Sequence, residues 1–328
     1  MSACNPIFRD IIDPNSAKNR QEIIKRIQKS LGGKLITYIS NPGHPFSGIM
    51  KLDVLPFEDM LRSVGESEKN FLMINCPGGD SNAAEKLLLM CRQRFTKEFD
   101  IIVPDYAKSA ATMLALGSDK ILMGYLAELG PIDPQLSTGL PPFQVEMIPA
   151  RSFIDGLEII RDKIKKGDPP AMYLSMLGRI RPEVLGVCQR AIEDSRMFAE
   201  KWLKKCMLKG DPKQAELVAK LLSEGEEYKS HGKVINFEDA KNVLKLDVEK
   251  IDEKSDLWND IWELYCRSVH FLMQGGGAKL FESDSVSLTL DIGVKGPPPT
   301  PTQAPPKPPQ KMVGKTGNCE SPASSAPS

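Results

Sequence analysis

Histidine is scarce in this sequence, with three residues among 328. They are His44, His231 and His270, and none stands at metal-ligand spacing from another histidine or from a cysteine pair. The seven cysteines are scattered and form no CxxC pair, which favours reduced thiols and argues against a structural zinc. We therefore predict no metal and no other cofactor, and very few candidates for a general base.

The chain also lacks an excess of charge and a long apolar run. Lysine plus arginine equals aspartate plus glutamate at 43 each, so no basic field favours nucleic acid or an anionic membrane as partner. The start of the chain contains no apolar signal segment, and nowhere do about eighteen apolar residues run together. We expect a cytoplasmic protein that has no membrane span and binds no nucleic acid.

Apolar residues make up 41% of the chain, which is enough for a sizeable core. In the first half, short apolar runs alternate with amphipathic segments. The patterns predict strands at 35–39, 71–75, 99–103 and 120–123, and helices at about 17–31, 56–63, 81–95 and 109–116. Strands that alternate with helices in this way form βαβ units, so we predict an α/β fold with a largely parallel sheet.

The second half has a different pattern. Helical periodicity with interleaved lysines and glutamates predicts helices at 149–166, 182–208, 213–222, 236–244 and 256–273. The first three belong to a predicted helical insertion at about 149–223. We divide the chain into an N-terminal helical segment (1–34), a main domain (35–274) and a proline- and serine-rich tail (285–328) that we expect to be disordered.

Two segments of the first half have the features of an acyl-transfer site. The apolar run that ends at Asn75 is followed by Gly78 and Gly79, and Ser109 stands where a strand gives way to a helix. Acyl transfer needs unobstructed backbone N–H groups that face a developing negative charge, and a hydroxyl presented at a sharp turn. An ordinary turn at the glycines and a helix N-cap at Ser109 are the plainer alternatives.

The three histidines differ in their surroundings. His44 lies in a proline- and glycine-rich loop, and His270 lies in an apolar helix where a packing role is expected. His231 precedes Gly232 in a loop between two helices. It is therefore the best candidate for a general base.

Four short motifs occur in order and at compatible spacing: Pro77-Gly78-Gly79, Ala107-Lys108-Ser109-Ala110-Ala111-Thr112, Leu129-Gly130-Pro131-Ile132-Asp133-Pro134-Gln135, and Ser230-His231-Gly232 ahead of Phe237-Glu238-Asp239-Ala240. With their surroundings they resemble the Clp protease/crotonase superfamily, most closely its serine dehydrogenase proteinase family. The resemblance covers roughly residues 35–273. It implies a Clp/crotonase-like spiral of ββα units.

The resemblance also implies residue roles. Clp-type peptidases have the chain order serine, histidine, aspartate, whereas Ser109, Asp133 and His231 follow the order described for the smaller family. The implied activity is that of a serine endopeptidase, with Ser109 as nucleophile, His231 as base and Asp133 as its partner. The backbone N–H groups of Gly79 and Ala110 would form the oxyanion hole.

The resemblance further implies a peptide or protein substrate and a homo-oligomer. The sequence has no Walker motif, so any ATPase partner must be a separate chain.

Alternatives to this hypothesis remain at the level of the sequence. Related signal-peptide peptidases use a serine–lysine dyad, for which Lys163, Lys165 and Lys166 lie at a suitable distance along the chain. Asp133 precedes a proline and also fits a turn initiator. A catalytically idle scaffold that recruits partners through its proline-rich tail is another possibility. Acyl-CoA chemistry has the weakest support, because the sequence carries no CoA-specific signature.

Overall fold

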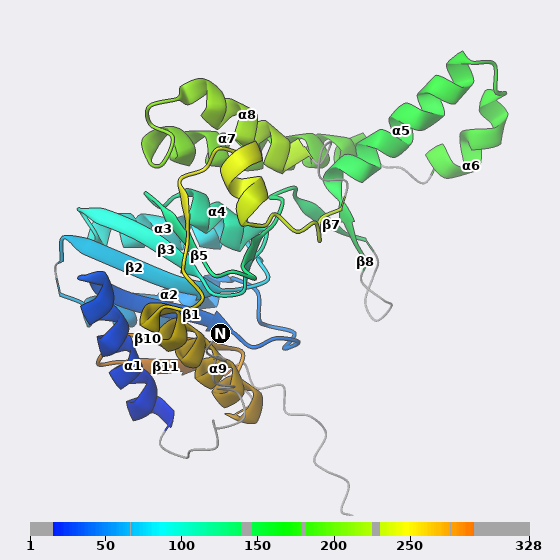
Figure 1. Cartoon of the computed structure of the whole chain (residues 1–328). Coiled ribbons are helices and arrows are strands. Elements are labelled where there is room, and N and C mark those ends of the chain that lie inside the picture. Colours follow the sequence, from blue (N-terminus) through cyan, green and yellow to red (C-terminus); the bar gives the residue numbers. More distant parts are fainter. Residues whose placement is uncertain are drawn as a thin grey trace, which may run out of the picture. The chain divides into compact units, whose positions relative to one another are not determined.

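A seven-stranded sheet forms the centre of the fold in the computed structural model (Figure 1). The structure describes residues 16–65, 67–138, 146–178, 182–224, 230–275 and 277–291. Along the sheet the strand order is β11-β10-β1-β2-β3-β5-β9. Five strands run parallel: β1 (Lys34–Ser40), β2 (Lys69–Asn75), β3 (Glu98–Val103), β5 (Ile121–Met123) and β9 (Val248–Lys250). The predicted α/β fold with a largely parallel sheet is therefore confirmed.

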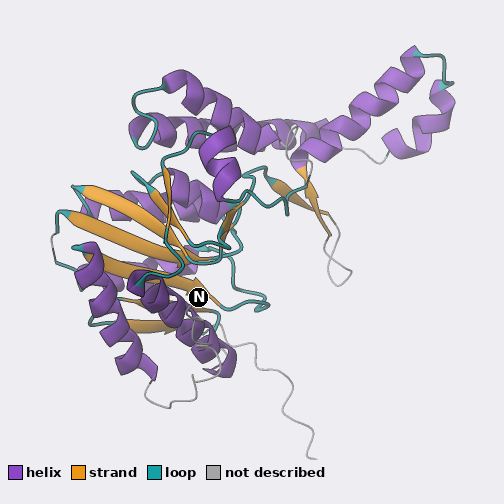
Figure 2. Ribbon diagram, viewed as in Figure 1, coloured by secondary structure: helices purple, strands orange, loops and turns teal. Residues whose placement is uncertain are grey.

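Helices cover both faces of the sheet (Figure 2). Alternate residues of β1 and β2 face opposite ways, as the period of a strand requires. Leu35 and Phe71 pack with helices α1 (Ser16–Leu31) and α9 (Asp256–Gly275). Ile36 and Leu72 belong to the second core cluster, with α2 (Val54–Arg62), α3 (Ser81–Arg94) and α4 (Ala110–Leu116). Because these strands are buried on both faces, they appear in the sequence as continuous apolar runs.

The predicted insertion contains a hairpin and a group of helices. The hairpin consists of β7 (Gln135–Thr138) and β8 (Glu146–Pro149), and the helices are α5 (Ala150–Lys165), η3 (Pro170–Tyr173), α6 (Leu174–Leu177), α7 (Pro182–Lys205) and α8 (Pro212–Glu224). Helix α7 contacts α5, α8 and α4. Trp202 of α7 is fully buried in the same core cluster as α4, so this part of the insertion shares the core of the main domain.

Shorter elements complete the described chain. They are η2 (Lys51–Asp53), β4 (Tyr106–Ala107), β6 (Glu128–Leu129) and the π-helical turn η4 (Asp239–Val243). Strands β4 and β6 pair with each other in a small separate sheet. The helix predicted at 236–244 exists in a shorter form, as η4. At its start the side-chain oxygen of Asn236 accepts a hydrogen bond from the backbone amide of Asp239 at 2.9 Å.

The predicted end of the main domain was wrong. We placed that end at residue 274 and a disordered tail from 285, but β10 (Lys279–Glu282) and β11 (Ser287–Leu290) continue the central sheet as antiparallel strands. The sequence pattern did not predict β10, because its charged residues Lys279 and Glu282 are typical of exposed positions. In the structure both are fully buried as partners of Asp53 and Arg20. Most of the predicted tail, residues 292–328, lies outside the described residues.

The predicted N-terminal segment is likewise not separate from the main fold over the part that the structure describes. Helix α1 contacts α9 and β1, and Arg20 on α1 forms an ion pair of 2.8 Å with Glu282 on β10. Its isoleucines Ile23, Ile24 and Ile27 are buried. Helix α1 therefore covers one face of the sheet together with α9, and its ion pair ties it to the edge strand pair β10 and β11.

One buried carboxyl group of the sheet has a raised pKa. Asp100 on β3 is 3% exposed, and its Oδ1 has no hydrogen-bond partner among the described residues. Burial, followed by the nearby carboxylates of Glu98 and Asp119, raises the pKa of Asp100 to about 7. The folded state then binds more protons than the unfolded state between about pH 4 and 7, so stability falls as pH rises through this window.

We expect Asp100→Asn to raise the free energy of unfolding by roughly 1–4 kcal/mol near pH 8. The gain should be much smaller at about pH 4, where Asp100 is protonated in the folded state and about half protonated in the unfolded state. Urea unfolding at the two pH values measures the difference. An equal gain at both would contradict the assigned cause.

Candidate active site

Ser109 lies at a strained turn between β4 and α4. Its backbone φ is +48°, a value that costs about 1–3 kcal/mol in a residue other than glycine. The turn is held by hydrogen bonds from the amide of Lys108 to the carbonyl of Cys76 at 3.0 Å and from the Thr112 hydroxyl to the carbonyl of Ala107 at 2.6 Å. The Ser109 side chain does not cap α4. Ser109 is therefore the N-cap residue of α4 by position only, and its hydroxyl is not used for capping.

The glycine pair after β2 is held against a neighbouring segment. The amide of Ile49 donates to the carbonyl of Gly78 at 2.6 Å, and the amide of Asp80 donates to the carbonyl of Ile49 at 2.9 Å. Gly78 and Gly79 have φ of +114° and +134°, which favours glycine strongly. A Cβ at Gly78 would lie 2.7 Å from the Cβ of Ser109, and one at Gly79 would lie 2.4 Å from backbone atoms of Ile49.

These bonds determine where the N–H of Gly79 points. Ile49 and Gly79 form a parallel bridge in which Ile49 bonds to the residues on either side of Gly79. The N–H of Gly79 itself therefore faces the other edge of the segment, away from Ile49. Gly79 is exposed and lines the same cavity as Ser109 and Ala110. Ala110 is the first residue of α4, where a backbone N–H lacks an intrahelical partner.

His231 and Asp133 form a hydrogen-bonded pair beside this turn. His231 Nδ1 lies 2.9 Å from Asp133 Oδ1, and the two side chains are 24% and 4% exposed. The contact uses Nδ1, which leaves Nε2 of the same ring for another partner. The backbone next to Asp133 is bonded to α8, because the amide of Ile132 donates to the carbonyl of Leu222 in that helix at 2.8 Å. The turn-initiator alternative for Asp133 does not account for its bond to a residue 98 positions away.

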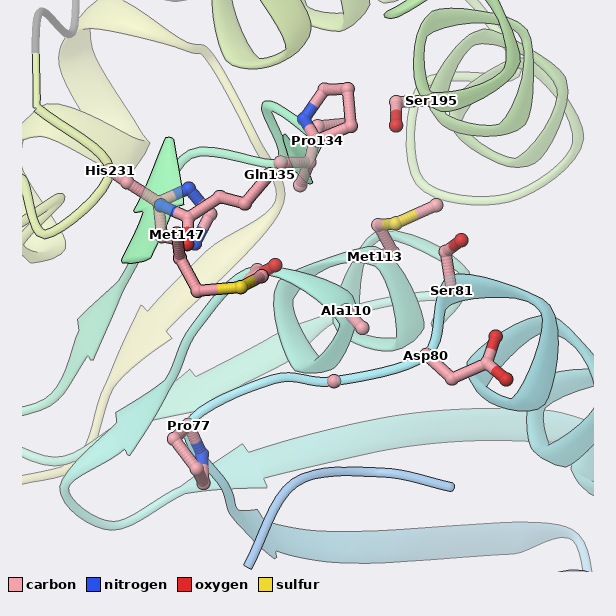
Figure 3. A pocket seen from close by; sticks show the side chains of 13 residues that line it. Pro77, Asp80, Ser81, Ala110, Met113, Pro134, Gln135, Met147, Ser195 and His231 are labelled. Carbon is pink, nitrogen blue, oxygen red and sulfur yellow. The ribbon is translucent and has the colours of Figure 1, made fainter. Parts of the chain in front are cut away.

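A cavity of about 440 Å³ joins these residues (Figure 3). Ser109, Ala110, Gly79 and His231 all line it. Asp133 lies behind His231, to which it is bonded. Four of the five residues that the sequence indicated thus line one cavity and the fifth is bonded to His231, while no hydrogen bond joins Ser109 to His231 in the described part of the chain.

The sequence analysis missed several residues that line the same cavity. Met147 comes from β8 and Ser195 from α7, so the insertion contributes to the wall, while Met113 comes from α4 (Figure 3). A second cavity of about 600 Å³ shares Met113 and Ser195 with the first and continues along α3 and α7. No sequence motif marks these positions, because a wall residue needs only to be near the site in space.

The lysines named in the sequence analysis have other surroundings. Lys163, Lys165 and Lys166 are exposed near the end of α5, and no lysine is among the described residues that line the cavity of Ser109. Lys108, next to the serine in sequence, forms an ion pair with Glu128 at 2.9 Å and donates to the carbonyl of Leu129 at 3.1 Å. Its charge is therefore already balanced by an acidic neighbour.

Two further observations concern the described part of the chain only. It contains no group of three or more histidine, cysteine, aspartate or glutamate side chains arranged to hold a metal ion. Within the same ranges, no helix combines the length and the apolar character needed to cross a bilayer.

Comparison with known proteins gives the family. Residues 9–271 match the family of ClpP-like SDH-type serine proteinases. The match spans most of the chain, so the protein belongs to this family of serine proteinases. The expected Clp-like α/β fold and the resemblance to the serine dehydrogenase proteinase family are thereby confirmed.

Similar individual proteins include two from Methanocaldococcus jannaschii. The uncharacterized protein MJ0137 is 29% identical over 239 residues, which are 70% of this chain and 73% of the relative. The uncharacterized protein MJ1495 is 26% identical over 211 residues, which are 62% of this chain and 64% of the relative. The chain thus covers somewhat less than two thirds of the second relative's length.

Solved structures of the 1510-N membrane-bound stomatin-specific protease are also similar. Two variants, the second in complex with a substrate peptide, align at 14% identity with TM-scores of 0.39 and 0.38. The alignments cover 70% and 75% of this chain, and 85% and 84% of the respective structures.

The close approach of Gly78 to Ser109 can be tested with matched substitutions. Gly78→Ala and Gly43→Ala both place a side chain at a positive φ, of +114° and +81°, but the new Cβ at position 43 meets nothing within 4 Å. We expect both to lose about 1–3 kcal/mol of stability from backbone strain, and Gly78→Ala to lose clearly more through the clash with Ser109. Urea unfolding measures both losses, and losses of equal size would contradict the close packing at Ser109.

Proposed function

We propose that this chain is a serine endopeptidase that hydrolyses peptide bonds through an acyl-enzyme on Ser109, with His231 as base and Asp133 as the partner of His231. The observation that carries the proposal is the hydrogen bond between His231 Nδ1 and Asp133 Oδ1 at the edge of the cavity that Ser109 lines. Membership in a family of serine proteinases supports the same reaction class.

The first half of the proposed reaction forms the acyl-enzyme. His231 Nε2 takes the proton of the Ser109 hydroxyl while the oxygen attacks the carbonyl carbon of the peptide bond. Asp133 accepts a hydrogen bond from the N–H at Nδ1, which fixes the tautomer and stabilises the imidazolium ion. The protonated Nε2 then gives its proton to the leaving amine, and the carbon–nitrogen bond breaks.

Backbone N–H groups stabilise the negative charge of the tetrahedral intermediate in this proposal. The N–H of Gly79 faces away from Ile49, and the N–H of Ala110 stands at the start of α4. Both residues line the cavity beside Ser109. Loss of one such donor typically costs about 2.7–4 kcal/mol of transition-state stabilisation. In the second half of the reaction, His231 activates a water molecule, which hydrolyses the ester and regenerates the serine.

The serine–lysine dyad has less support. A lysine acts as a base near neutral pH only when its pKa is lowered, usually by burial, and Lys163, Lys165 and Lys166 are exposed. The idle scaffold would leave the strained backbone of Ser109 without a purpose, since such strain is concentrated at functional sites.

The wider setting of the enzyme is also a proposal. A homo-oligomer is supported by large apolar side chains that the insertion exposes, among them Met172, Leu174 and Met176. A cytoplasmic location is supported by five cysteines that are all free in the described ranges. We expect a peptide or protein substrate and, if substrates must be unfolded, an ATPase in a separate chain.

Labelling by a fluorophosphonate probe tests the proposed roles. We expect Ser109→Ala to abolish labelling, and His231→Ala to slow it roughly 10²–10⁴-fold because the base is lost. Asp133→Asn should have a comparable effect, since it leaves the imidazole in the wrong tautomer. The labelling rate is followed by gel fluorescence and the modified residue is identified by mass spectrometry.

Lys163→Ala is the control and should label like the wild type. Labelling that depends on a lysine but not on His231 would favour the dyad. A folded wild type that does not label at all would favour the scaffold.

A further inference from the structure

A fully buried charged cluster lies beneath the segment that holds the glycine pair. Asp53, at the end of η2, receives a hydrogen bond from the Tyr38 hydroxyl at 2.8 Å and an ion-pair contact from Lys279 Nζ at 2.6 Å. All three residues are 0% exposed. Taking a carboxylate and an ammonium group out of water costs several kcal/mol per ion, and an ion pair of this kind is often no more stable than apolar side chains. The cluster therefore calls for an explanation other than stability.

A third contact of the Asp53 carboxylate links it to the backbone next to the proposed active site. Asp53 Oδ2 also accepts a hydrogen bond from the backbone amide of Met50 at 2.8 Å. Met50 is the residue after Ile49, whose amide and carbonyl groups bond to Gly78 and Asp80. A path of hydrogen bonds and one peptide unit thus runs from the buried carboxylate to the glycine pair.

The segment between residues 47 and 50 depends on such support. Ile49 forms only an isolated bridge there, so a longer strand does not fix the segment. At its other end, the Ser40 hydroxyl donates to the carbonyl of Ser47 at 2.7 Å. The thiol of Cys76 donates to the carbonyl of Gly78 at 3.4 Å, which adds a further contact under the glycines. The segment is therefore held at both ends and bonds to the glycine loop at its middle.

We infer that Asp53 is a positioning residue, which holds Ile49 in place through Met50 and thereby orients the N–H of Gly79 toward the substrate. Lys279 and Tyr38 in turn hold the carboxylate of Asp53 in the orientation that Met50 requires. The inference rests on the proposed function, because it assigns these residues to the oxyanion hole of Ser109. A displacement of about 1 Å in such a group can cost about a hundredfold in rate.

Two double variants separate the acceptor for Met50 from the buried charge. Asp53→Leu/Lys279→Met removes both charges together, so neither is left alone in the core, and it also removes the acceptor. Asp53→Asn/Lys279→Met removes the same charges but keeps a side-chain oxygen for the amide of Met50. The matched control is Arg20→Met/Glu282→Leu, which replaces the other fully buried ion pair and has no bond to the segment at 47–50.

Fluorophosphonate labelling of Ser109 and hydrogen exchange are measured on each variant after circular dichroism shows that it is folded. We expect Asp53→Leu/Lys279→Met to slow labelling about 10- to 100-fold and to speed exchange at the amides of Ile49 and Asp80. The asparagine variant should label within about threefold of the wild type, as should the control. The inference would be overturned if labelling and exchange were both unchanged in the leucine variant. It would also be overturned if labelling were slowed as much in the control.

Labelling and exchange together separate this inference from the proposed function. If the wild type fails to label, the proposed function and the catalytic part of the inference both fall. If the wild type labels and the leucine variant labels equally fast, only the inference falls. Should the leucine variant not fold, exchange in the wild type still decides, because amides of Ile49 and Asp80 as unprotected as those of exposed loops would contradict a held segment.

Discussion

The backbone pairing of Ile49 with the glycine pair is the constraint on which the site depends. It turns the N–H of Gly79 away from Ile49, and it requires two left-handed residues in succession, Gly78 and Gly79. A side chain at Gly78 would collide with Ser109, and one at Gly79 would collide with Ile49. The serine can therefore lie beside Gly78 only because that residue has no side chain.

The sheet supplies the frame in which this pairing occurs. Strand β2 ends directly before the glycine loop, and the amide of Cys76 donates to the carbonyl of Tyr106 at 3.1 Å, which holds the turn of Ser109 against the same strand end. Ligands of open α/β sheets commonly bind at the carboxyl ends of the strands, and the cavity lies there. Asp133 and His231 come from segments outside the central sheet, so the site depends on those segments as well as on the sheet.

The insertion has two roles in this structure. Helices α7 and α8 share the main core, and Ser195 and Met147 reach the wall of the cavity. The walls of the cavity therefore combine the frame of the sheet with side chains of the insertion.

Local patterns in the sequence were sufficient to predict the parallel sheet and to single out Ser109 and the glycine pair as candidate site residues. The strands are buried on both faces and so have long apolar runs, and the positive φ at residues 78 and 79 strongly favours glycine there. The pairing of Asp133 with His231 spans 98 positions, and only the resemblance to a family suggested it. Strand β10 was missed because Lys279 and Glu282 look solvent-exposed in sequence, whereas distant charges neutralise them in the core. Asp53 carries no motif either, since its importance comes from contacts with Tyr38, Met50 and Lys279.

The central claim is that Ser109 and His231 act as one unit, and a double-mutant comparison tests it most directly. The rate of hydrolysis of p-nitrophenyl acetate would be measured for the wild type, Ser109→Ala, His231→Ala and the variant with both changes. Residues that act together in catalysis lose the same activity when either or both are removed, so the account predicts one low rate for all three variants. A His231→Ala variant as fast as the wild type, or a combined loss equal to the product of two separate losses, would contradict it.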